Sequence, residues 1–166
     1  MSDMPKFLAD DHGRIRRSFN DYKRINNMDA ALNVCDHLWI HLTIEVELAH
    51  PAVWNSLSST EAEGLSAADD QISRLMETID SLEPNDRSLG QQMTLLQRAV
   101  DAHIVAYDKY LMPKLRARPD QLEMGRDAFR RWQELFEERP PRTWRPMDRL
   151  ANTGWGGGGR LPGAGW

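Results

Sequence analysis

A row of three polar side chains within an apolar stretch constrains this chain most. Residues 37–45 read His-Leu-Trp-Ile-His-Leu-Thr-Ile-Glu. A helix advances about 100° per residue, so His37, His41 and Glu45 are expected one turn apart on one face. The neighbouring residues make that face apolar, so the row would point into a core, where it needs a partner. A metal ion would satisfy it; one histidine bonded to a backbone carbonyl, with the others reaching solvent, is the alternative.

Hydrophobic periodicity predicts four long helices and a shorter fifth one. They are expected from Asp3 to Ile25, from Asp29 to Pro51, from Thr60 to Glu83, from Arg87 to Met112, and over about residues 120–138. Asp3 is a candidate N-cap, and Thr60 with Glu63 has the spacing of a capping box. Pro51 and Pro113 are expected to end their helices, because proline lacks the donor that continues one.

Short connections between long helices make neighbours antiparallel, which favours an all-α fold with an up-down-up-down four-helix bundle. The expected division is a bundle over residues 1–118, an additional packing helix over 119–139, and an irregular tail rich in proline, glycine and tryptophan over 140–166. The tail's tryptophans are expected to dock on something. A flexible tail is the alternative, because glycine loses most entropy on ordering.

The composition excludes several classes of function. The 166 residues suit one domain, and 21 lysines and arginines against 25 acidic residues give a net charge of −4. That balance predicts neither nucleic-acid nor anionic-membrane binding. No signal peptide and no run of about 18 apolar residues is found, and a lone Cys35 fits a reducing compartment. A cytoplasmic protein is the expectation.

Four of the five histidines fall on the inward faces of three expected helices: His12, His37, His41 and His103. Asp69 on the third helix and Tyr107, one turn after His103, are expected to face the same interior. Neutral imidazoles cannot all find donors in a core, so this cluster predicts a metal. Coincidental histidines in an all-α bundle are the alternative. His50 is expected at the surface, because it lies on the opposite side of its helix from His41.

The mixture of imidazole and carboxylate indicates which metal the site would take. Histidines and carboxylates on four facing helices are typical of a dinuclear non-haem iron centre. Zinc usually closes at four ligands, and magnesium avoids nitrogen. The expected cofactor is therefore two iron ions, with manganese as the alternative.

Three motifs follow one another in an order typical of a known family. They are Asp11-His12-Gly-Arg-Ile, then His41-Leu-Thr-Ile-Glu45-Val-Glu47 leading to Pro51, then His103-Ile-Val-Ala-Tyr107-Asp108 leading to Pro113. Over about residues 5–115 the chain resembles the hemerythrin-like, or HHE cation-binding, family. The resemblance implies a four-helix bundle with a diiron-oxygen centre. His12, His41, Glu45 and His103 match the family's ligands.

The chain departs from that family's usual pattern at three positions. Tyr107 stands where a glutamate or aspartate is usual, Asp69 lies where a histidine is usual, and His37 stands where glutamate is common. A tyrosine ligand implies a phenolate on ferric iron. The pattern, with the tryptophan-rich tail, looks like the mycobacterial branch of hemerythrin-like proteins, for which catalase-type decomposition of hydrogen peroxide is reported.

The expected function is disproportionation of hydrogen peroxide at a diiron site. The expected metal ligands are His12, His37, His41, His103 and Asp69 as terminal ligands, Glu45 as a bridge and Tyr107 as a phenolate, with Glu45 and Tyr107 also catalytic. A protein that binds or senses dioxygen, nitric oxide or iron without turnover is the alternative. A third reading is an interaction module with a structural metal. A monomer or a homodimer fits each reading.

Overall fold

The computed structural model describes residues 2–138 and is all-helical there, as the sequence predicts. The long helices are α1 (Met4–Ile25), α2 (Met28–Ile44), α4 (Ser59–Asp80), α5 (Leu89–Ala106) and α7 (Gln121–Glu137). Shorter segments are η1 (Glu45–Ala49), α3 (His50–Val53), η2 (Trp54–Ser56), η3 (Tyr107–Leu111) and α6 (Met112–Arg116). The predictions for the tail, residues 140–166, lie outside the described residues. None of the helices within residues 2–138 combines the length and the apolar character of a membrane span.

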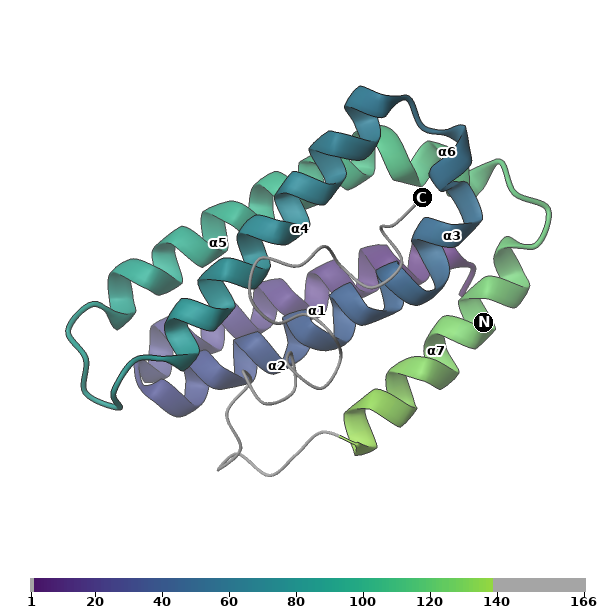
Figure 1. Ribbon diagram of the computed structural model, residues 1–166. Coiled ribbons are helices and arrows are strands. Elements are labelled where there is room, and N and C mark those ends of the chain that lie inside the picture. The colour runs from purple at the N-terminus through teal and green to yellow at the C-terminus, as the bar shows by residue number, and fades with distance from the viewer. Residues whose placement is uncertain (1, 139–166) are drawn as a thin grey trace.

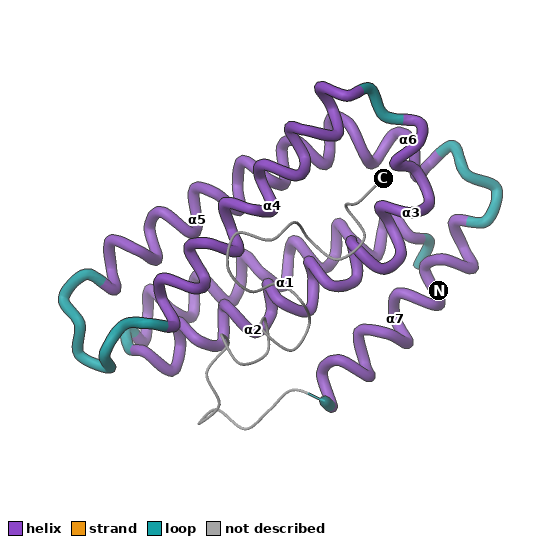
Figure 2. Tube along the Cα trace, in the orientation of Figure 1, coloured by secondary structure: helices purple, strands orange, loops and turns teal. Residues whose placement is uncertain are grey.

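Figure 1 shows two antiparallel pairs of helices lying side by side. α1 packs along α2, α4 packs along α5, and successive long helices reverse direction. The fifth helix predicted by the sequence is α7, which packs on the outside of α1 and α2. Figure 2 shows that short loops join these helices within the described residues. The inner face of α4 is apolar and buried at Leu65, Ile72, Met76 and Ile79.

The structure confirms one predicted helix start and corrects two. Asp3 caps α1, because its Oδ1 accepts the backbone N–H of Lys6 at 2.8 Å. α2 was expected to begin at Asp29, but it begins at Met28 and is capped by Asn27. The predicted capping box at Thr60 is wrong, since the box forms two residues earlier, between Ser58 and Glu61. Both serine and threonine have a glutamate three residues on, but only Ser58 has the extended backbone that an N-cap requires.

The helices also continue past both prolines that were expected to end them. Pro51 lies in α3 and Pro113 lies in α6, and each follows a five-residue π-helical turn, η1 or η3. In these turns the N–H of His50 bonds to the carbonyl of Glu45, and the N–H of Met112 bonds to that of Tyr107. Proline lacks a donor and its ring clashes with a carbonyl four residues back. The wider turn accommodates both defects, so the prediction of two helix ends was wrong.

Candidate metal centre

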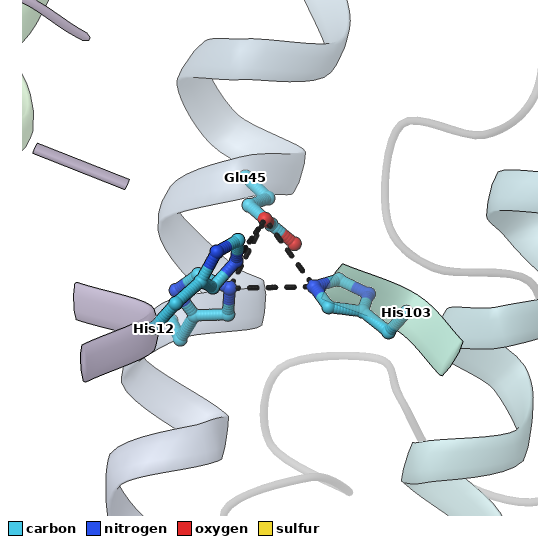
Figure 3. A group of neighbouring side chains, drawn as sticks. His12, Glu45 and His103 are labelled. Atoms are coloured by element: carbon cyan, nitrogen blue, oxygen red, sulfur yellow. Dashed lines mark hydrogen bonds and ion pairs between the residues drawn. The ribbon is translucent and has the colours of Figure 1, made fainter. Parts of the chain in front are cut away.

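Three imidazoles and one carboxylate meet in the core between the two helix pairs (Figure 3). They come from four segments: His12 from α1, His41 from α2, Glu45 from η1 and His103 from α5. Oε1 of Glu45 lies 3.0 Å from Nε2 of His41, 3.5 Å from Nε2 of His103 and 4.0 Å from Nε2 of His12. Nε2 of His41 and Nε2 of His103 are 3.4 Å apart. All four side chains are buried, so their polar atoms face one another and not water.

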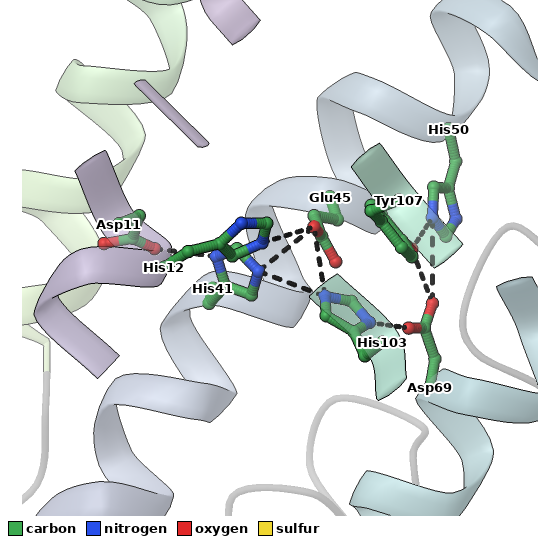
Figure 4. A network of polar contacts seen from close by, with 8 residues as sticks. All are labelled: Asp11, His12, His41, Glu45, His50, Asp69, His103 and Tyr107. Carbon is green, nitrogen blue, oxygen red and sulfur yellow. Dashed lines mark hydrogen bonds and ion pairs between the residues drawn. The ribbon is translucent and has the colours of Figure 1, made fainter. Parts of the chain in front are cut away.

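A carboxylate behind each of two imidazoles fixes how that ring is turned (Figure 4). Oδ2 of Asp11 lies 2.8 Å from Nδ1 of His41, and Oδ1 of Asp69 lies 2.8 Å from Nδ1 of His103. Because Nδ1 of each ring donates to its carboxylate, Nε2 is the nitrogen that faces Glu45. This is the arrangement that orients a metal-binding histidine, with the outer carboxylate fixing the ring.

The buried charges shift one another's pKa values. Burial alone would lower the pKa of His41, but Glu45 and Asp11 raise it to about 10. Burial would also lower the pKa of His103, but Glu45 and Asp69 raise it to about 9. Burial and the charge of His41 lower the pKa of His12 to about 3. Burial would raise the pKa of Glu45, but the two imidazoliums hold it well below its usual range.

The unsatisfied atoms of this group fit a metal ion. Within residues 2–138, Nε2 of His12 and both carboxylate oxygens of Glu45 are buried and take part in no hydrogen bond of suitable geometry. Atoms bound to one ion at about 2.1 Å lie about 3.0 to 3.5 Å from one another. Three of the four separations above fall in this range. Buried polar atoms without partners are rare, so the four residues are suited to hold a cation.

A second group of potential ligands shares Glu45 with the first. The group consists of Glu45, His50 and Asp69, and one potential ligand atom from each lies within 4.8 Å of those of the other two. The hydroxyl of Tyr107 donates to Oδ2 of Asp69 at 2.8 Å and also contacts Nε2 of His50 (Figure 4). Burial, and then the charge of Asp69, raise the pKa of Tyr107 well above its usual value, so in this arrangement Tyr107 is a neutral phenol.

His50 is buried at 5 % exposure, so its predicted surface position was wrong. In an α-helix nine residues separate His50 from His41 by about 180°. The π turn between them takes up one extra residue, which removes about 100° of that rotation and brings His50 to the inner side. One signal in the sequence points to the turn: Pro51 follows Glu45, and Pro113 follows Tyr107, at the same spacing.

The two groups contain most of the predicted ligands and leave His37 outside them. The first group contains His12, His41, Glu45 and His103, and Asp69 belongs to the second, in contact with Tyr107. His37 is half-buried on α2 and belongs to neither group. Asp11 was not predicted as part of the site. Its position directly before His12 gave no reason to expect that it would orient a histidine of another helix, His41.

Comparison with protein-family models, with curated proteins and with solved structures gave no significant match.

Proposed function

We propose that this chain is a hemerythrin-like four-helix-bundle protein that holds two iron ions and decomposes hydrogen peroxide. The observation that carries the proposal is the shared carboxylate: Glu45 belongs to a group with three histidines and to a second group with His50 and Asp69. A carboxylate common to two groups is suited to bridge two ions. Imidazole and carboxylate ligands suit iron, and ligands from facing helices are the usual way in which bundles build diiron sites.

Peroxide disproportionation passes two electrons and two protons from one peroxide molecule to another, giving dioxygen and two waters. Bound iron would supply the Lewis acidity and the two-electron redox change. The residues of the chain supply binding, orientation and exclusion of water. Asp11 and Asp69 hold the imidazoles of His41 and His103 in position, and burial of the ligand atoms keeps bulk water away.

Proton transfer falls to Tyr107, because His50 and Asp69 would hold the second ion. The hydroxyl of Tyr107 lies between Oδ2 of Asp69 and Nε2 of His50, and burial keeps it a neutral phenol. Tyr107 Oη can give its proton to one peroxide and take a proton from the other. Groups positioned in this way for proton transfer contribute typically about 10²- to 10⁴-fold to a rate.

The test is metal content together with oxygen evolution. Full-length protein loaded with ferrous iron in air should retain about two irons per chain, as expected of bundle diiron sites, and should release dioxygen from added peroxide. His41→Gln should lose iron, because His41 faces Glu45. His37→Gln should keep it, because His37 lies one turn away and belongs to neither group.

Two results would overturn the peroxide proposal. Iron that binds and forms a stable adduct with dioxygen or nitric oxide, without release of dioxygen from peroxide, would make this a binding or sensing protein. A purified protein that retains no iron or manganese would leave the buried histidines with a structural role only.

A further inference from the structure

A cavity separate from the metal centre opens between α1 and α7. Its volume is about 460 Å³, which lies within the size range of small-molecule pockets. α1 contributes Phe7, Asp10 and Arg14 to its lining, and α7 contributes Arg126 and Phe129. None of these five residues belongs to the two ligand groups around Glu45. The cavity is therefore a separate feature with a chemistry of its own.

The walls of the cavity are partly aromatic. Phe7 is buried, whereas Phe129 is 52 % exposed and is one of the large apolar side chains on the surface. An apolar molecule bound in the cavity would cover the exposed ring of Phe129 and remove it from water. These walls favour an occupant with an apolar or aromatic body.

Two guanidinium groups line the same cavity. Arg14 is held in place, because its Nε donates to Oδ1 of Asp11 at 2.8 Å and its guanidinium lies over the rings of Phe7 and Trp132, at 5.6 and 5.2 Å. Its remaining nitrogens form no hydrogen bond with the described residues. Arg126 is exposed and forms no ion pair or hydrogen bond within residues 2–138.

The acidic groups near the cavity do not neutralise this charge. Asp10 is paired with Lys6 at 2.7 Å, and Asp11 is paired with Arg14. Among the charged lining residues, Arg126 is therefore the one without an ion-pair partner in residues 2–138, in a chain whose net charge is −4. A cavity with surplus positive charge and aromatic walls is complementary to an anion that carries an apolar body.

We infer that the cavity between α1 and α7 binds a small amphipathic anion, with an aromatic or aliphatic body against Phe7 and Phe129 and a carboxylate or phosphate-like head between Arg14 and Arg126. The preorganised side chain of Arg14 favours binding, because little rotamer freedom is lost. The chain's own segment 139–166 is a poor occupant on charge, since it contains five arginines and one aspartate.

The test compares two ligands of nearly equal shape on the full-length protein. Titration calorimetry with 2-naphthoate should give saturable binding at one site per chain, and its neutral counterpart 2-naphthylmethanol should bind about tenfold more weakly, because charge-assisted contacts are lost. Arg126→Gln should weaken 2-naphthoate binding by about five- to tenfold while leaving 2-naphthylmethanol unchanged. Phe129→Ala should weaken both ligands.

Arg98→Gln is the matched control, because Arg98 is an exposed arginine on α5, which does not line the cavity. It should leave both affinities unchanged. The inference is overturned if 2-naphthoate does not saturate, if the alcohol binds equally well, or if Arg98→Gln and Arg126→Gln have equal effects. The titration needs no iron, so its outcome is independent of the proposed peroxide chemistry.

Discussion

Arg131 of α7 and Glu47 of η1 form an ion pair through two contacts. Nε of Arg131 lies 2.7 Å from Oε2 of Glu47, and Nη2 lies 3.1 Å from Oε1. Glu47 is two residues from Glu45, which both ligand groups share. The ion pair therefore links α7 directly to η1, the π-helical turn that carries Glu45. Arg118, in the segment before α7, adds a hydrogen bond from Nη1 to the backbone carbonyl of Ala52 in α3 at 2.7 Å.

Breaking this ion pair should have a small effect on stability. The side chains of Arg131 and Glu47 are 30 % and 41 % exposed, so Arg131→Gln should lower the free energy of unfolding by only about 0.5 to 1 kcal/mol. Urea denaturation measures the change. Arg130→Gln is the control, because Arg130 pairs only with Asp127 of its own helix among the described residues. Equal effects of the two substitutions would show that the link to η1 contributes nothing specific.

Gly125 of α7 lies directly against the backbone at the start of α1. A Cβ there would lie 2.2 Å from the carbonyl oxygen of Ser2 and 2.7 Å from the carbonyl carbon of Asp3, which are backbone atoms. Gly125→Ala should therefore lower stability by about 1 to 3 kcal/mol through overpacking. Gly64→Ala is the counterpart within α4, with nothing within 4 Å, and should raise stability by about 0.5 to 1 kcal/mol. Thermal unfolding of both variants tests the sign of each change.

Removing the hydroxyl of Tyr107 leaves polar groups unpaired in the core. Oδ2 of Asp69 loses a donor, so Tyr107→Phe should lower stability by about 1 to 3 kcal/mol without unfolding the protein. A visible phenolate band of the iron-loaded protein should also disappear if Tyr107 binds iron. Tyr110→Phe, on the same turn but half-buried, should change neither property. A loss of stability with an unchanged spectrum would restrict Tyr107 to hydrogen bonding.

The metal-free protein should lose stability as the pH rises. The pKa values of His41 and His103 are about 10 and 9 in the folded chain, above the ordinary value of 6.5. Their stabilisation is complete below pH 6.5 and is lost as the pH rises through 9 and 10. The urea midpoint should therefore fall between neutral pH and pH 10. A midpoint that stays level over that range would contradict charged imidazoles in the core.

Metal binding should release these same protons. A metal takes the neutral form of an imidazole, so His41 and His103 must each lose a proton when an ion binds at Nε2. Apparent affinity should rise with pH across the neutral range. Calorimetry of metal binding in two buffers of different ionisation enthalpy measures the number of protons released. No difference between the buffers would mean that binding displaces no proton.

Much of this arrangement could be predicted from residue spacing. Helical periodicity identified the long helices, and the four-residue step from His41 to Glu45 placed both side chains on one inner face, as α2 and η1 have them. That step succeeds because the backbone is still α-helical up to Glu45, whose N–H bonds to the carbonyl of His41. Asp3 also capped its helix as predicted, since a cap depends on only a few neighbouring residues.

The errors arose where the chain departs from regular geometry. Counting an α-helical register through η1 placed His50 on the wrong face. A constant helical period does not account for the extra residue in the π turn. Proline predicts a helix end, but the wide turns η1 and η3 let the helices continue through Pro51 and Pro113. The pairing of Asp11 with His41 joins different helices and depends on tertiary packing, which a single sequence does not specify.

Sharing Glu45 between two groups of ligands also has a consequence for a binding isotherm. Two ions that share one carboxylate cannot bind independently. The first ion changes the charge and the orientation of the carboxylate to which the second ion binds. Titration with ferrous iron should therefore deviate from a model with two identical, independent sites. The group with three histidines is the candidate to bind the first ion. Glu45→Gln weakens the shared ligand, so the isotherm of this variant should come closer to that of independent sites.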